Sequence, residues 1–183
     1  AGKQSDVLFI VDNSGSMGEE QQALASNFKQ FTQAADIWAT NYHIGVVTTD
    51  MDAADQSGKL RLADGFRVVT PKTPNGTDVL QKMTKPGAGG SGNEQGLAAA
   101  EAALTLPLTF DSSQKCTADA DCKQAGGSCI PNADDNATKM CGGTNRTFLR
   151  KNAGLEVVIL SDEEDGSGSD VNYYINFFYS IKG

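Results

Sequence analysis

The sequence predicts an α/β fold, a three-layer sandwich in which helices cover both faces of a mostly parallel central sheet. Short continuous apolar segments, such as Val7-Leu8-Phe9-Ile10, are typical of strands buried on both faces of a parallel sheet. Longer segments with apolar residues three and four positions apart alternate with them, as amphipathic helices would. The chain has 183 residues, which suffices for a single domain, 1–183, with its own hydrophobic core.

The predicted strands are the segments rich in β-branched and aromatic residues. They lie at 6–12, 42–48, 66–70 and 155–160. Only the polar stretch 50–65 separates the second strand from the third, so we expect these two to pair in antiparallel fashion through a long hairpin loop. Helical segments separate the other strands, and such crossovers are what parallel pairing requires.

The predicted helices have helical spacing of apolar residues or a high alanine content. They lie at 19–39, 94–104, 147–153 and 170–182. The loop 86–93 contains four glycines, which no regular element tolerates, and it leads into the second helix. Gly154 stands where a C-terminal cap of the third helix is expected.

A cysteine-rich insertion, 108–146, interrupts this alternation. It contains every cysteine of the chain, namely Cys116, Cys122, Cys129 and Cys141. Zinc sites favour closer Cys-x-x-Cys pairs or added histidines, but the single histidine, His43, lies far away in a predicted strand. The even, clustered count predicts two disulfides, with three connectivities open. Disulfides form in oxidising compartments, so we expect a secreted, periplasmic or cell-surface protein.

Composition excludes several classes of partner. The chain has 23 acidic and 15 basic residues, and its net charge of −8 argues against binding of nucleic acid or an anionic membrane surface. No apolar segment approaches the roughly 20 residues of a membrane-spanning helix, so we expect no direct membrane insertion.

Oxygen-bearing side chains follow two of the predicted parallel strands and occupy the glycine-rich loop. Asp12, Ser14 and Ser16 form an Asp-x-Ser-x-Ser motif, whose alternate side chains can converge on one point. Asp162 follows the strand 155–160, and Ser91 lies in the loop 86–93. Ligands of open α/β sheets bind at the carboxyl ends of the strands. An oxygen-only set of ligands at this edge favours a hard cation such as Mg²⁺.

This constellation resembles the von Willebrand factor A (VWA) family. Its metal-ion-dependent adhesion site combines Asp-x-Ser-x-Ser, a threonine from a glycine-rich loop, and an aspartate after a later buried strand. The resemblance covers most of 5–107 and 147–182 and implies a Rossmann-like fold. It implies that Ser14 and Ser16 bind the metal directly and that Asp12 and Asp162 act mostly through bound water. Ser91 stands where the family usually has threonine, and it keeps the hydroxyl.

The resemblance implies an adhesion module, similar to bacterial cell-surface adhesins, in which a Glu or Asp carboxylate of a protein partner completes the metal shell. The alternative is an assembly module, in which the same site docks a neighbouring domain or subunit of a larger surface protein. A Mg²⁺-dependent phosphoryl-transfer enzyme ranks third, because the haloacid dehalogenase type needs a second Asp where this chain has Ser14. The chain also has neither a Gly-x-Ser-x-Gly elbow nor a Gly-Lys-Ser/Thr phosphate loop, so we expect no enzyme.

Glu94 has two interpretations. It either caps the start of its helix through backbone amides or adds a carboxylate to the metal site. In the second case the extra negative charge would favour Ca²⁺ or Mn²⁺ over Mg²⁺ and weaken capture of an external carboxylate.

The last two strands of the family's six-stranded order, 3-2-1-4-5-6, have no counterpart before Gly183. The strand 155–160 would then be an apolar edge, which invites pairing. We therefore expect a further chain or domain, or a continuation of the polypeptide, to cover it.

Overall fold

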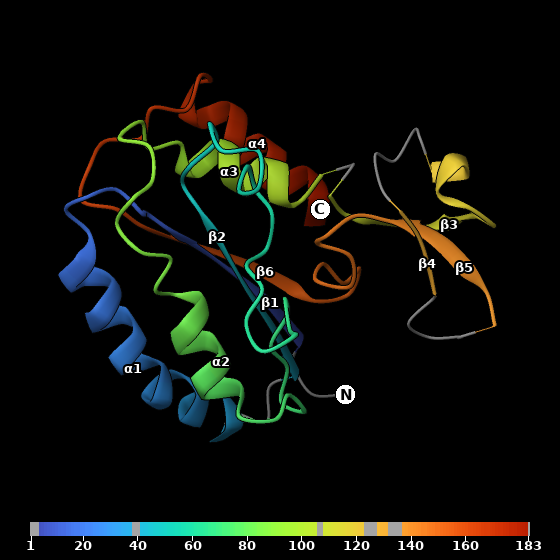
Figure 1. Cartoon of the computed structure of the whole chain (residues 1–183), viewed down its shortest axis with the longest axis horizontal. Coiled ribbons are helices and arrows are strands. Elements are labelled where there is room, and N and C mark those ends of the chain that lie inside the picture. Colours follow the sequence, from blue (N-terminus) through green and yellow to red (C-terminus); the bar gives the residue numbers. More distant parts are fainter. Residues whose placement is uncertain (1–3, 38–40, 106–107, 123–127, 132–136, 183) are drawn as a thin grey trace.

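The computed structural model describes residues 4–37, 41–105, 108–122, 128–131 and 137–182. The fold is α/β. Strands β1 (Gln4–Val11), β2 (Asn41–Thr48) and β6 (Gly154–Leu160) form a parallel sheet in the order β2-β1-β6 (Figure 1). The predicted strands 6–12, 42–48 and 155–160 are thus confirmed within two residues at their ends. His43 lies in β2, half-buried.

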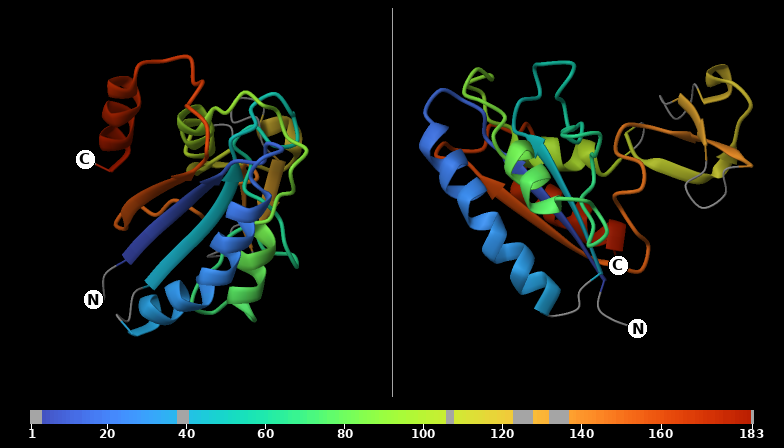
Figure 2. Two further views of the ribbon diagram at one scale, coloured as in Figure 1. Left: turned by 90° about the vertical axis from the view of Figure 1, so that its left-hand side faces the viewer. Right: turned by 60° about the horizontal axis from the view of Figure 1, so that its bottom comes forward.

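Two helices cover each face of this sheet, as the end-on view shows (Figure 2). Helices α1 (Gly18–Ile37) and α2 (Gly76–Met83) lie on one face, and α3 (Gly96–Ala103) and α4 (Val171–Lys182) lie on the other. Side chains of a strand alternate between faces. Val7, Phe9 and Val11 of β1 accordingly share a core cluster with α1 and α2, whereas Leu8 and Ile10 share one with α3 and α4. The last two positions of the predicted helix 19–39 lie outside the described residues.

Three elements differ from the prediction. The segment 66–70 forms no strand; it contributes two isolated antiparallel bridges, one between Val69 and Ile44 of β2 and one between Phe66 and Ala63. Helix α2 was not predicted, and it closes the core below the Val69 bridge with Val79, Leu80 and Met83. The segment 147–153 is a series of turns instead of a helix, and Gly154 begins β6 instead of capping.

The failure at 147–153 has a physical cause. Asn145, just before it, is almost fully buried, and its side-chain amide donates to the carbonyls of Gly58 and Ala103. Arg150 donates its backbone N–H and its Nε–H to Asp6 in β1. These tertiary hydrogen bonds replace the local ones that a helix would make.

The insertion folds as a small antiparallel sheet in the order β3-β5-β4. Its elements are β3 (Phe110–Lys115), the 3₁₀ turn η1 (Asp119–Cys122), β4 (Ser128–Pro131) and β5 (Lys139–Gly142). Disulfides join Cys116 to Cys129 and Cys122 to Cys141, which confirms two disulfides and selects one of the three connectivities. Figure 1 and the right-hand view of Figure 2 place the insertion at the opposite end of the molecule from the loop after β1.

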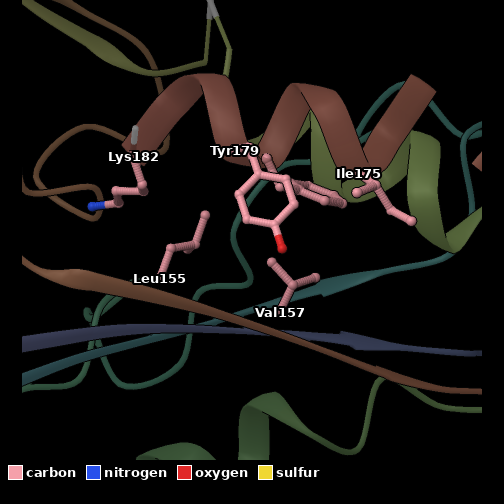
Figure 3. Close-up of a pocket in the computed structure, with 6 residues that line it drawn as sticks. Leu155, Val157, Ile175, Tyr179 and Lys182 are labelled. Carbon is pink, nitrogen blue, oxygen red and sulfur yellow. The ribbon is translucent and has the colours of Figure 1, made fainter. Parts of the chain in front are cut away.

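Strand β6 is an edge of the sheet, because among the described residues it pairs only with β1. Val158 and Ile159 are each 39% exposed. On the face toward α4, a groove of about 420 Å³ separates strand from helix, and Leu155 and Val157 rise into it beneath Tyr179 (Figure 3). No helix of the described part is long and apolar enough to span a membrane.

Candidate cation site at the carboxyl edge of the sheet

The loops that leave β1 and β6 meet at one edge of the sheet through Asp12. This side chain is fully buried. Its Oδ1 accepts the backbone N–H of Ser14 at 2.7 Å, and its Oδ2 accepts the hydroxyl of Ser161 at 2.6 Å. The first bond fixes the turn of the Asp-x-Ser-x-Ser motif, and the second ties that motif to the end of β6.

Four of the predicted metal ligands form one continuous network. The hydroxyl oxygens of Ser14 and Ser16 are 3.3 Å apart, and the hydroxyl of Ser16 donates to Oδ1 of Asp162 at 3.1 Å. Gln21 of α1 links the loop after β1 to the glycine-rich loop, because its Nε2 donates to the carbonyl oxygens of Asp12 and Gly87. The structure therefore brings together four predicted ligands, Asp12, Ser14, Ser16 and Asp162. Their positions after parallel strands predicted this proximity.

Ser91 makes its hydrogen bonds elsewhere. Its hydroxyl donates to Oδ2 of Asp52 at 2.7 Å, and its backbone N–H donates to Oδ2 of Asp50 at 3.1 Å. The glycine-rich loop still touches the motif, since Gly90 N–H donates to the carbonyl of Asn13 at 2.8 Å. The structure thus brings the loop to the site but directs the Ser91 hydroxyl toward the loop after β2.

Glu94 occupies the position next to Asp12. It lies before α3, but neither of its carboxylate oxygens accepts a backbone N–H of that helix, so the capping interpretation of Glu94 is wrong. Its carboxyl group is 3% exposed; Oε2 accepts the hydroxyl of Thr49, and Oε1 has no hydrogen-bond partner. Burial raises the pKa of Glu94 to about 7, and the Thr49 hydrogen bond opposes this. The charge of Asp12, a hydrogen bond that the protonated Glu94 shares with Asp12, and the charge of Glu163 raise the pKa further, so the oxygen of Glu94 is orphaned in the ionised form.

The orphaned oxygen of Glu94 fits a bound cation. A buried carboxylate oxygen without a donor costs free energy, and two neighbouring buried carboxylates repel each other. A divalent ion between them would remove both costs. Because the other oxygens at this point belong to serine hydroxyls and to the Asp162 carboxylate, the donor set suits Mg²⁺, Ca²⁺ or Mn²⁺ better than a soft metal.

The acidic turn after β6 positions α3. Oδ2 of Asp165 accepts the backbone N–H of Leu97 at 2.9 Å, and the hydroxyl oxygen of Ser167 accepts that of Ala98 at 2.9 Å. Gly166 N–H also donates to the carbonyl of Glu94. These bonds cap α3 from a distant loop and hold Glu94 against the site, a role that the sequence analysis did not assign to Asp165.

The described part of the chain has no purely acidic metal cluster. Its only group of three or more His, Cys, Asp or Glu side chains with ligand atoms within 4.8 Å of one another is Cys116, Cys122 and Cys129. These sulfurs are in disulfides and are not available as ligands. A cation at Asp12 would therefore depend on serine hydroxyls and water in addition to carboxylates.

Sequence reasoning also missed Thr49 and Ser161, which hold the two buried carboxylates in place. The available signal was their position, since each follows a parallel strand at the same edge. No protein-family model matches this chain, and neither does any curated protein or solved structure.

Proposed function

We propose that this chain is a VWA-like adhesion module that binds an acidic group of a protein partner through a divalent cation. The observation that carries the proposal is the network of Asp12, Ser14, Ser16 and Asp162 beside the orphaned carboxylate oxygen of Glu94. Serine hydroxyls can turn their lone pairs toward an ion without moving the backbone. The cation would supply an electrophilic position for the partner's carboxylate.

We favour Glu94 over Ser91 as the fifth contributor to the site. Ser91 donates its hydroxyl to Asp52, whereas Glu94 has a free oxygen next to Asp12. A site with Glu94 carries more negative charge, which favours Ca²⁺ or Mn²⁺ over Mg²⁺ and weakens the attraction of the cation for the partner's carboxylate. The disulfides of the insertion are typical of an oxidising compartment, and we place the module in a secreted, periplasmic or cell-surface protein.

An assembly module is the second candidate, and the edge strand β6 favours it. The exposed Val158 and Ile159 and the apolar groove under α4 are surfaces that a neighbouring domain or a further strand could cover (Figure 3). The two candidates differ in where the partner binds: adhesion requires the cation site, and assembly at β6 does not.

Thermal unfolding with and without divalent cations tests the proposal. We expect Mg²⁺, Ca²⁺ or Mn²⁺ to raise the melting temperature of the wild-type chain, because a ligand at one hundred times its Kd stabilises by about 2.7 kcal/mol. EDTA should reverse the rise, and Asp12→Asn and Ser16→Ala should each abolish it while unfolding remains cooperative.

Glu164→Ala is the matched control. Glu164 belongs to the same acidic turn but is exposed and makes no hydrogen bond in the described part of the chain. If Glu164→Ala loses the cation response as fully as Asp12→Asn does, the ion binds a diffuse acidic surface and the proposed site is wrong.

A further inference from the structure

A second pocket opens beside the candidate cation site, at the outer edge of β2. It has a volume of about 380 Å³ and is lined mainly by polar side chains, among them Thr48, Asp55, Gln56, Lys59, Arg61 and Arg67. Arg61 N–H donates to the carbonyl of Val46 at 2.8 Å, so the segment that carries the basic residues runs along β2. Oε1 of Gln56 accepts hydrogen bonds from Thr48 and from Asn13 of the Asp-x-Ser-x-Ser loop.

Arg61 is the unusual residue of this pocket. Its guanidinium is half-buried and makes no ion pair or hydrogen bond with the described residues, and its Nε is buried without a partner. Burial lowers the pKa of Arg61 from its usual value. A buried Nε–H without an acceptor costs free energy, which an incoming anion that accepts its hydrogen bond would recover.

The charges around Arg61 are not balanced by the chain. Lys59 and Arg67 are tied to backbone carbonyls, Lys59 to Ala54 at 2.7 Å and Arg67 to Leu60, and neither forms an ion pair with a described residue. Asp55 is the one acidic residue of the lining. The pocket is therefore a basic spot on a chain whose net charge is −8.

We propose that this pocket binds an anionic ligand through a carboxylate or phosphate group, with the Arg61 guanidinium as its anchor. The planar fork of arginine donates two parallel hydrogen bonds to either group, which a lysine cannot reproduce. Arg61 is not among the candidate cation ligands, so this proposal and the proposed function can fail separately.

Titration of isotope-labelled protein in EDTA, at constant ionic strength, tests this site. Succinate and inorganic phosphate are the two anionic probes, and the neutral succinamide is the control ligand. We expect succinate or phosphate to shift the Nε–H resonance of Arg61 saturably, and the tighter of the two identifies the preferred group. Succinamide should leave the resonance unchanged. Binding should persist in Asp12→Asn.

Three variants separate a binding role from a structural one. Arg61→Met should weaken the preferred anion at least tenfold without lowering the melting temperature, because it removes an unpaired buried cation. Arg61→Lys should retain part of the affinity. Lys72→Met removes a charge from an exposed residue outside the pocket and should bind like wild type. Equal affinity of Arg61→Met and Lys72→Met, or loss of the folded state in Arg61→Met, would overturn the proposal.

Discussion

The two ends of the parallel sheet treat buried carboxylates in opposite ways. At the amino end, Asp6 is fully buried and is neutralised by the chain itself: Arg150 Nε lies 2.7 Å from Oδ1, and Lys182 Nζ lies 3.2 Å from Oδ2. At the carboxyl end, Asp12 and Glu94 are just as inaccessible, yet no described Lys, Arg or His pairs with either. The same fold thus satisfies one buried acid and leaves two others without a cation.

At the amino end, the buried carboxylate of Asp6 is part of a cluster of hydrogen bonds and ion pairs within the chain. Arg150 also donates to the carbonyls of Ser5 and Asn41 and to the side chain of Asn41, and Lys182 donates to the carbonyl of Arg150. This cluster joins β1, β2, the turn before β6 and the end of α4. Its role is structural, since both carboxylate oxygens of Asp6 accept hydrogen bonds from within the chain.

The carboxyl end, in contrast, collects the incomplete groups. The described residues contain three buried side-chain atoms without a hydrogen-bond partner: Asn13 Oδ1, Glu94 Oε1 and Arg61 Nε. All three belong to segments at or next to the carboxyl ends of β1 and β2. Buried polar groups are normally paired, so their concentration at one edge supports the proposals that place ligands there.

Breaking the amino-end cluster should have the largest effect. Arg150→Met leaves the buried Asp6 with only Lys182 as a cationic partner, and removal of one partner of a buried ion pair costs about 3–5 kcal/mol. Chemical denaturation measures this free energy of unfolding. Lys151→Met, at an exposed neighbour without such contacts, should change it by less than about 0.5 kcal/mol. A similarly small loss of unfolding free energy in both variants would show that the Asp6 ion pairs contribute little, and the contrast between the two ends of the sheet would not hold.

At the carboxyl end, removing the charge of Glu94 should raise the free energy of unfolding when no cation is bound, whereas Arg150→Met lowers it. Its pKa is raised from 4.5 to about 7, so between these pH values the folded protein keeps a proton that the unfolded chain has released. Stability should therefore fall as pH rises through this window, by about 3 kcal/mol in total, and then level off.

Glu94→Gln should abolish this fall and should be more stable than wild type at pH 8 in EDTA, as judged by denaturation at several pH values. Saturating Ca²⁺ or Mg²⁺ should remove the fall of stability with pH in the wild-type chain and should leave the pH profile of Glu94→Gln unchanged. A pH profile identical in the two proteins would show that Glu94 is ionised without cost, and the orphaned oxygen would then indicate nothing about a cation.

The sequence predicted those parts of the fold that depend on continuous local patterns. The apolar runs of β1, β2 and β6 allow no other placement, and because their carboxyl ends share an edge, Asp12, Ser16 and Asp162 had to meet. Helix α2 escaped prediction because it is eight residues long and begins inside the turn-forming sequence Pro74-Asn75-Gly76. The helical spacing of its apolar residues was present in the sequence, but the turn-forming residues at its start argued against a helix.

Residue choice within loops was less predictable. Whether Ser91 or Glu94 faces Asp12 depends on the path of the glycine-rich loop, which is set by the acceptors of Asp50 and Asp52 in a different loop. The sequence could not predict that Arg61 has no partner among the described residues, because a sequence shows which charges are present but not which are neutralised. Local patterns therefore located the edge, and tertiary hydrogen bonds decided which side chains face it.

The smallest expected effect distinguishes the two candidates for the fifth ligand. Ser91→Ala removes the hydrogen bond to Asp52 and the one that the Asn93 N–H donates to the Ser91 hydroxyl. It should cost about 1–2 kcal/mol of stability while leaving cation affinity within about twofold of wild type. Ser14→Ala, which removes a hydroxyl from the network around Asp12, should lower cation affinity about tenfold or more. Calorimetric titration with Ca²⁺ and Mg²⁺ gives both affinities. Equal losses in the two variants would mean that Ser91 leaves Asp52 and turns toward the ion on binding, so that the ligand set expected from the Asp-x-Ser-x-Ser resemblance would hold and Glu94 would be a neighbour of the site instead of a member.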